Sequence, residues 1–312
     1  MSNDAIVFVV NPKSANGATL RRFDRLRARF AAALGTIEVR LTERPRHAVE
    51  LTRDAIRAGA RAVVAVGGDG TNNEVVNGFF DDAGAALGSA AFGFVCSGTG
   101  GDFRRTFGQS TDPLEALERL RRFQTRDIDV GRLRFIDHEG VERSWMYVNS
   151  GSIGLVGKVV EIANTSSKAL GPQVTFLSAA VRGLFSYQPQ RVRLHFDDDA
   201  NPVEDAFLLV SVANGKYFGG GMKIAPDAAP DDGLLDCVMV RGAGPGLLRH
   251  MPKLYLGTHV EVASMVSVRR CRKVRVEPVD ANDRVLVELD GEQPGRLPGT
   301  FEAVPRALRL LA

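Results

Sequence analysis

The sequence predicts two domains of different classes, an α/β domain with a parallel sheet and crossover helices over residues 1–130 and a mainly-β sandwich domain over residues 131–299. Before residue 130, short apolar runs alternate with amphipathic helical patterns, as in a parallel sheet. After it, strand-like runs follow one another closely across turn-rich separators, which favours a β-sandwich. A chain of 312 residues that is 44% hydrophobic and 25% charged has room for two cores.

The expected elements follow from these runs in chain order. The strands of the first domain are expected at residues 6–10, 37–41, 62–66 and 92–96. Between the first two, apolar residues recur at helical spacing, at Leu20, Phe23, Leu26, Phe30 and Leu34. The strands of the second domain are expected at residues 130–136, 145–149, 192–196, 206–213, 235–240, 274–277 and 285–289, with a helical insertion at 156–186. The cleft between two such domains is the expected ligand site.

A glycine-rich turn after the third strand carries the strongest functional signal. Glycines let a ligand approach the main chain closely, and the free N–H groups of the following helix favour a phosphate. Asp69 would repel a bare phosphate, which indicates Mg²⁺ between them. A tight connection would have a similar composition, but the chain has neither a Walker A pattern nor G-x-G-x-x-G, so a different phosphate-binding design is needed. The expected contacts are Gly67, Gly68, Asp69, Gly70, Thr71, Asn73 and Glu74.

Five motifs, in order, resemble those of the diacylglycerol kinase catalytic-domain family, which includes bacterial lipid kinases and sphingosine kinases. They lie at residues 11–17, 67–74, 98–103, 214–236 and 290–292. The resemblance spans the whole chain and implies a first domain like those of NAD kinases and diacylglycerol kinases, with residues 300–312 packing back on it. Two departures stand out, because Ala15 replaces a frequent glycine and Gly101 replaces a usual asparagine. Position 101 is therefore not counted as a contact.

The resemblance also implies the catalytic roles. Phosphoryl transfer needs an acceptor hydroxyl in line, charge neutralisation on the phosphates and a recipient for the hydroxyl proton. Glu292 is the implied general base, and Asp290 and Asp69 are implied to hold Mg²⁺ or its waters. Taken alone, Asp-Gly at 290–291 would favour a solvated hairpin turn. Because four further motifs of the same family are present, the catalytic interpretation of residues 290–292 is favoured.

Further nucleotide contacts are expected at the ends of the strands of the first domain. They are Asn11, Ser14, Asn16, Thr42 and Thr99. The first three could equally be turn-formers after a strand. Thr42 could also cap the helix that is expected to start near Arg46.

The acidic segment 226–234 is a candidate for a second metal site. It lacks the EF-hand spacing, so a calcium loop is excluded. The resemblance implies a structural Mg²⁺ held by the carboxylate of Asp232 and the backbone carbonyls near Ala229 and Leu234. The alternative is a solvated acidic turn.

Several classes are disfavoured by composition. Three widely spaced cysteines without C-x-x-C indicate neither a disulfide framework nor a zinc site and suit a reducing cytosol. No apolar run approaches the ~20 residues of a membrane span, and the first one, ending at Asn11, reads as a strand rather than a signal peptide. A net charge of +3 does not demand nucleic acid.

The expected function is that of a cytoplasmic, ATP-dependent lipid kinase of phospholipid biosynthesis that visits the membrane surface to collect its substrate. Diacylglycerol is the preferred acceptor, giving phosphatidic acid, and kinases of sphingoid bases, ceramide or other lipids remain alternatives. NAD kinases and phosphofructokinases share Gly-Gly-Asp-Gly-Thr, but residues 214–236 and 290–292 favour lipids. A nucleotide sensor without turnover is disfavoured by Asp69 and Glu292. The sequence leaves the oligomeric state open, with a homodimer as one alternative.

Overall fold

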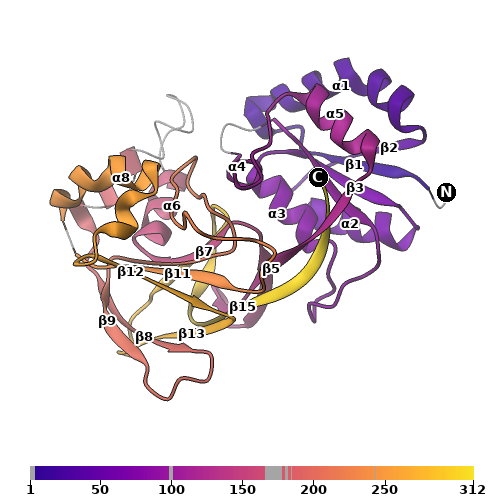
Figure 1. The fold of residues 1–312 in the computed structure, drawn as a ribbon. Coiled ribbons are helices and arrows are strands. Elements are labelled where there is room, and N and C mark those ends of the chain that lie inside the picture. Colours follow the sequence, from indigo (N-terminus) through magenta and orange to yellow (C-terminus); the bar gives the residue numbers. More distant parts are fainter. Residues whose placement is uncertain (1–3, 98–100, 166–177, 180–181, 184, 243) are drawn as a thin grey trace. The chain divides into compact units, whose positions relative to one another are not determined.

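The computed structural model separates into two compact units, which are coloured along the chain in Figure 1. The first contains residues 1–130 and 305–312, and the second contains residues 131–304. Strands β5 (Thr125–Asp137) and β15 (Glu292–Leu311) each begin in one unit and end in the other. The structure describes residues 4–97, 101–165, 178–179, 182–183, 185–242 and 244–312.

The first unit is built on a parallel sheet. Its strands run in the order β2 (Ile37–Leu41), β1 (Ile6–Val10), β3 (Ala62–Gly67) and β4 (Ala91–Cys96), and the end of β15 adds to β4 in parallel. Strands β1 and β3 are buried along their whole length, as central strands covered on both faces must be. Their unbroken apolar sequences therefore specify their place in the sheet.

Helices cover both faces of this sheet, as Figure 1 shows, with α1 and α5 on one face and α2 and α3 on the other. Their bounds are α1 Ser14–Leu34, α2 His47–Arg57, α3 Asp69–Asn77, α4 Asp102–Thr106 and α5 Pro113–Arg122. On α1, Phe23 and Phe30 lie two turns apart and so share a face. Their rings pack on Phe8 of β1 at centroid distances of 5.2 and 5.3 Å. This aromatic cluster fixes α1 against the sheet.

The second unit is a sandwich of antiparallel strands in which β15 takes part in both layers. One layer runs β12 (Val266–Cys271), β11 (Leu235–Val240), β10 (Leu209–Ala213), β7 (Ser150–Gly154), β14 (Leu286–Leu289), β15. The other runs β9 (Val203–Phe207), β8 (Gln190–Phe196), β13 (Lys273–Pro278), β15, β5, β6 (Glu142–Tyr147). The fold class predicted from the sequence, α/β followed by a β-sandwich, is confirmed.

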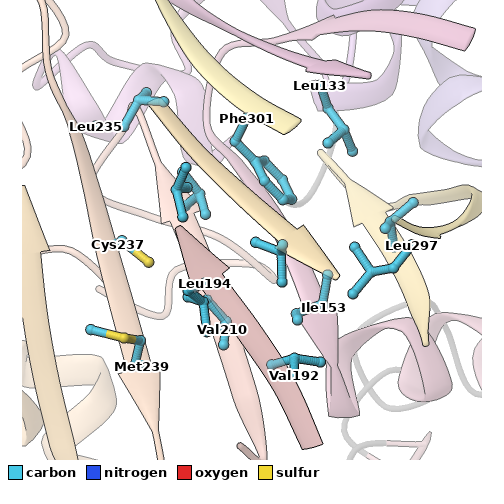
Figure 2. Close-up of a cluster of buried hydrophobic side chains, with 14 of the residues drawn as sticks. Leu133, Ile153, Val192, Leu194, Val210, Leu235, Cys237, Met239, Leu297 and Phe301 are labelled. Atoms are coloured by element: carbon cyan, nitrogen blue, oxygen red, sulfur yellow. The ribbon is translucent and has the colours of Figure 1, made fainter. Parts of the chain in front are cut away.

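The sandwich core is filled by alternate residues of these strands. Figure 2 shows Ile153, Val210 and Leu194 converging from β7, β10 and β8, with Phe301 of β15 beside them. On β10 the intervening residue, Ser211, therefore lies on the outer face of its layer. Sheet periodicity thus gives β10 an apolar inner face and an outer face on which Ser211 is the polar residue.

Helices lie against the outer face of that layer. Helix α6 (Leu155–Thr165) packs on β7 and β14, and the short helical turns η1 (Pro245–His250), α8 (Met251–Leu256) and η2 (Thr258–Glu261) follow β11. Val156 of α6 joins a second apolar cluster with Leu209 and Val238 on the outer face. No helix in the described parts of the chain is long and apolar enough to span a membrane.

Candidate functional site

The carboxyl ends of β1 and β3 bring two of the sequence motifs together. The backbone N–H of Asn11 donates to the carbonyl of Val66 at 3.0 Å, continuing the strand pairing. Its side-chain Nδ2 donates to Oγ1 of Thr71 at 3.2 Å. Asn11 and Thr71 are 60 residues apart, and parallel strands place them at one edge of the sheet, where ligands bind in open α/β folds.

The glycine turn itself is shaped by a close approach of helix to strand. A Cβ atom added to Gly67 would lie only 2.3 Å from Oγ1 of Thr71, so no side chain fits at that position. Gly68 occupies the N-cap of α3 and has no side chain to cap it. No heavy atom of the described residues lies within 4 Å of a Cβ added to Gly70, so these residues leave that side of the turn open. The start of α3 therefore presents backbone N–H groups as an anion site requires.

Asp69 is engaged in a structural role at this turn. Its carboxylate accepts the backbone N–H of Asp102 at 3.0 Å and that of Phe103 at 3.2 Å. These are the first N–H groups of α4, so Asp69 caps a helix that begins 33 residues later. A carboxylate has about four lone-pair sites, which leaves room for a hydrated cation. The Mg²⁺-holding role of Asp69 stays a prediction.

Glu74 makes the equivalent contact with a different helix. Its carboxylate accepts the N–H groups of Arg46 at 3.0 Å and Ala48 at 3.2 Å, at the start of α2. The alternative role of Thr42 as the cap of this helix is therefore wrong, because a side chain from α3 supplies the acceptor. Thr42 is buried beside β1, where its N–H donates to Val10 at 3.0 Å. It lies at the same sheet edge as Asn11.

Two further predicted contacts are hydrogen-bonded to other groups of the protein. Asn73 is buried in α3, and its Oδ1 accepts from Nδ2 of Asn77 at 3.2 Å. Ser14 donates its hydroxyl to the carbonyl of Asn11 at 3.0 Å, which closes the turn after β1. The interpretation of Ser14 as a turn-former therefore holds alongside its predicted nucleotide contact.

A short chain of hydroxyl groups extends from Ser14 and was missed by the sequence analysis. Ser14 Oγ lies 2.5 Å from Oγ1 of Thr19, which lies 2.7 Å from Oγ of Ser97. Thr19 is almost fully buried, although it precedes the apolar helical pattern of α1. Ser97 directly follows β4, so these hydrogen-bonded hydroxyl groups connect the first motif with the end of the strand that precedes residues 98–103. In the sequence, the position of Ser97 directly after an apolar strand was the feature that could have indicated its role.

Helix α1 is interrupted just after its first residue, where the chain that follows β1 contains three consecutive left-handed residues. Ala15, Asn16 and Gly17 have φ angles of 50°, 54° and 78°. Asparagine and glycine adopt this conformation readily, whereas alanine is disfavoured there. The replacement of a frequent glycine by Ala15 therefore places a strained residue within the candidate nucleotide loop.

The third motif is described only from residue 101 onward, and the predicted contact Thr99 lies outside the described residues. Gly101 is the N-cap of α4 and has a φ of 67°. Glycine and asparagine are the two residues that visit this region most easily. The departure from the family pattern at this position is thus compatible with the backbone that the position requires.

In the second unit, residues 290–291 form a two-residue hairpin turn between β14 and β15. Leu289 pairs with Glu292 across the turn, and Asp290 and Gly291 have φ angles of 46° and 97°. Two positive φ angles define the type I′ turn that Asp-Gly favours. The hairpin interpretation of this motif is therefore correct, and it does not exclude a functional one. Glu292 is exposed on the first residue of β15.

The carboxylate of Asp290 is committed to the segment before β7. It accepts the N–H of Val148 at 2.9 Å, of Asn149 at 3.0 Å and of Ser150 at 3.1 Å. These three hydrogen bonds hold residues 148–150 beside the turn. The role of Asp290 in holding Mg²⁺ or its waters stays a prediction. The carbonyl of Asn149 in turn accepts the N–H of Asn214, at 2.9 Å, which starts the 214–236 motif. Asp290 therefore links two motifs that lie far apart in the sequence.

The acidic loop around Asp232 is held by protein groups. One carboxylate oxygen of Asp232 accepts the N–H of Leu234 at 3.0 Å, and the other pairs with Arg270. The carbonyl of Ala229 accepts the N–H of Asp231 at 2.8 Å. Within the ranges that the structure describes, no three side chains of His, Cys, Asp or Glu are grouped to hold a metal ion. A Mg²⁺ ion on Asp232 would share the carboxylate with Arg270, and the metal role of Asp232, Ala229 and Leu234 stays a prediction beside the acidic-turn alternative.

Comparison with known proteins finds similar sequences over nearly the whole chain. The model of the diacylglycerol kinase catalytic domain matches residues 5–133, and that of the YegS C-terminal NAD kinase beta sandwich-like domain matches residues 148–312. A diacylglycerol kinase of Mycobacterium tuberculosis is 30% identical over 311 residues, covering 98% of this chain and 94% of the relative. A protein of Xanthomonas oryzae pv. oryzae named probable lipid kinase YegS-like is 29% identical over 309 residues, covering 97% and 94%.

Solved structures show the same fold. The crystal structure of a diacylglycerol kinase from Bacillus anthracis str. Sterne aligns with a TM-score of 0.70 at 20% identity, covering 98% of this chain and 96% of that one. A second structure from the same strain aligns with a TM-score of 0.77 at 23% identity, covering 98% and 94%. At these identities the likeness concerns the fold alone.

Proposed function

Because the chain belongs to the diacylglycerol kinase catalytic-domain family, we propose that it transfers the γ-phosphoryl group of ATP to the hydroxyl of a diacylglycerol. The product is phosphatidic acid, a phosphomonoester. The observation that carries the proposal is the glycine turn at Gly67 and Gly68, which leaves the start of α3 uncapped by its own N-cap residue at a parallel-sheet edge. Such a turn binds phosphate through backbone N–H groups without a P-loop.

The nucleotide-binding role falls to the first unit. Gly67 lies so close to Thr71 that no side chain fits between them, while no described residue occupies the space beside Gly70. A rigid set of N–H donors stabilises phosphate charge without reorganising during transfer. Asn11 adds a polar side chain at the same edge and is oriented by its bond to Thr71.

Mg²⁺, when bound, would supply charge neutralisation on the phosphates. Asp69 in the first unit is the side chain that we assign to Mg²⁺ or its waters there, and Asp290 in the second unit is assigned the same kind of role. Both carboxylates are already oriented by backbone N–H donors, so they are held in place before the ion binds. Oxygen ligands of this kind suit Mg²⁺, which retains several waters.

The proton-accepting role falls to Glu292. It is exposed at the start of β15 and directly follows a turn that is anchored through Asp290. A general base must reach the hydroxyl it deprotonates, and an exposed carboxylate on a fixed turn meets that requirement. The acceptor is a membrane lipid, so the protein must contact the bilayer surface from the aqueous side.

The direct test is to incubate the purified protein with γ-labelled ATP, Mg²⁺ and a total lipid extract in mixed micelles, and to identify the labelled product. Labelled phosphatidic acid is the expected result. A labelled sphingoid base or ceramide would reassign the acceptor within lipid kinases, and labelled NADP or sugar phosphate in a parallel soluble assay would remove the lipid assignment. ATP binding without any labelled product would indicate a nucleotide sensor.

A further inference from the structure

A buried glutamate lies two residues before the proposed catalytic turn. Glu288 of β14 is only 3% exposed, and its Oε1 accepts the backbone N–H of Gly291 at 2.5 Å. Gly291 lies between Asp290 and Glu292, inside the turn. Glutamate is rarely this buried unless its carboxylate is held by partners, so the site is unusual for its residue type.

The strand pairing is irregular at this same residue. Val287 pairs with Gly295, but Leu289 pairs with Glu292, so the register shifts between the two pairs. Glu288 therefore faces two residues of β15, Gln293 and Pro294, where a regular ladder would place one. Proline has no N–H to give to the ladder. A β-bulge of this kind increases the local twist and redirects side chains, often beside active sites.

Side-chain hydrogen bonds add to the preference of Asp-Gly for its left-handed backbone. Asp290 has a φ of 46°, a conformation that non-glycine residues seldom adopt. Two carboxylates hold the turn. The carboxylate of Asp290 accepts the N–H groups of residues 148–150, and that of Glu288 accepts the N–H of Gly291. Hydrogen bonds to an ionised carboxylate are shorter and stronger than those between neutral groups.

Glu288 is also part of a polar row across the outer face of its layer. It lies opposite Ser152 of β7, whose hydroxyl donates to Ser211 of β10 at 3.1 Å. Both serines are fully buried. The three residues occupy neighbouring strands at one level of the sheet, on the face against which α6 packs. Glu288 therefore lies within a strand of the sandwich layer rather than in a loop.

We propose that Glu288 is a positioning residue for phosphoryl transfer: by binding the N–H of Gly291 it fixes the turn and hence the direction in which Glu292 leaves it. This inference rests on the proposed function, because it assumes that Glu292 accepts the proton. Glu288 itself touches neither substrate nor nucleotide in this role. It acts through the backbone of Gly291.

The test compares two substitutions of similar size. Glu288→Gln retains a side-chain oxygen that can accept from Gly291, whereas Glu288→Met fills the same space without a strong acceptor. We expect Glu288→Met to lower kcat by about 10- to 100-fold, the order of loss caused by misplacing a catalytic group by ~1 Å. KM for ATP should be unchanged, and Glu288→Gln should restore most of kcat. Glu302→Gln is the control, since Glu302 lies on β15, the strand that begins at Glu292, and pairs with Arg132 rather than with the turn.

Amide hydrogen exchange at Gly291 provides a readout that does not depend on activity. Exchange should be slow in the wild type and in Glu288→Gln and fast in Glu288→Met. A folded Glu288→Met protein with wild-type kcat, equal exchange at Gly291 in all three proteins, or a Gln variant as impaired as the Met variant would each overturn the positioning role. If the wild type phosphorylates no lipid, the proposed function fails, while the exchange rates still decide whether Glu288 holds the turn.

Discussion

The carboxylate of Asp69, at the start of α3, accepts the backbone N–H of Asp102 at the start of α4. The glycine turn and the third sequence motif are therefore joined by a side chain that the sequence assigns to metal binding. Glu74, one turn further along α3, holds the start of α2 in the same way. Helix α3 thus connects the proposed phosphate site to two neighbouring helices, and a substitution in it has structural as well as chemical effects.

Substitution of Asp69 should affect stability and turnover separately. Asp69→Ala removes the cap of α4 and should lower the free energy of unfolding by about 1 kcal/mol, the usual contribution of a helix cap. Asp69→Asn keeps one acceptor oxygen and should cost less stability, but turnover should be nearly lost in both. Asp112→Ala, which removes the cap of α5, is the matched control and should destabilise without loss of turnover. Turnover of Asp69→Asn equal to wild type at saturating Mg²⁺ would exclude the metal role.

The two glycines of the turn should respond in opposite ways to alanine. Gly67→Ala places a Cβ 2.3 Å from Oγ1 of Thr71, and overpacking of this kind typically costs about 1–3 kcal/mol. Gly70→Ala meets no atom of the described residues within 4 Å and lies in α3, so stability should be kept or raised by about 0.5–1 kcal/mol. ATP affinity should still fall in Gly70→Ala, because the methyl group narrows the open side of the turn. Chemical denaturation and calorimetric titration with ATP measure the two effects, and an unaltered ATP affinity would place the phosphates elsewhere.

Glu292→Gln keeps the shape of the side chain and removes its ability to accept a proton. Loss of a general base typically lowers kcat by ~10²–10⁴. ATP affinity and thermal stability should be unchanged, because the residue is exposed at the turn. Steady-state kinetics with calorimetric ATP binding decide the role, and a variant that loses ATP affinity but keeps kcat would reassign Glu292 to binding.

A second Mg²⁺ site at Asp232 can be separated from the ion pair seen there. Asp232→Asn removes both the partner of Arg270 and the metal ligand, whereas Arg270→Ala keeps the ligand and removes the ion pair with Asp232 and a longer one, of 3.7 Å, with Asp236. An exposed ion pair contributes only about 0–1 kcal/mol, so Arg270→Ala should change little. If a structural ion binds, Asp232→Asn should lose stability and activity, and excess Mg²⁺ should partly restore both through mass action. Identical behaviour of the two variants, without any Mg²⁺ dependence, would leave only an acidic turn.

The three cysteines should differ in reactivity toward thiol reagents under native conditions. Burial raises the pKa of the Cys271 thiol to about 12 and that of Cys237 well above its usual range, so neither forms thiolate near neutral pH. Cys96 is only half-buried and pairs in register with Gly67 at the end of β4. A thiol titration should show one fast site in the folded protein and three after denaturation, and ATP should slow the fast one. Rapid modification of all three in the folded state would contradict the buried core.

Local sequence was sufficient for the fold class and for the conformation of several turns. Unbroken apolar strands such as β1 and β3 specify a sheet that is buried on both faces, and the alternation of apolar with polar residues along β8 specifies a sandwich layer. Asp-Gly at 290–291 specifies a type I′ hairpin because its backbone needs two positive φ angles. Each of these properties depends on neighbouring residues only, which is why a pattern within a short window predicts it.

The partners of the functional carboxylates were decided by tertiary structure alone. Sequence analysis assigned Asp69 and Asp290 to Mg²⁺ and Glu74 to nucleotide, but the fold gives all three backbone N–H donors from segments 26 to 142 residues away. It also buries Glu288, which no motif singled out, at a bulge that arises only when β14 pairs with β15. A hydrogen bond depends on the position of both partners, and for these pairs only the packed strands and helices bring the partners together.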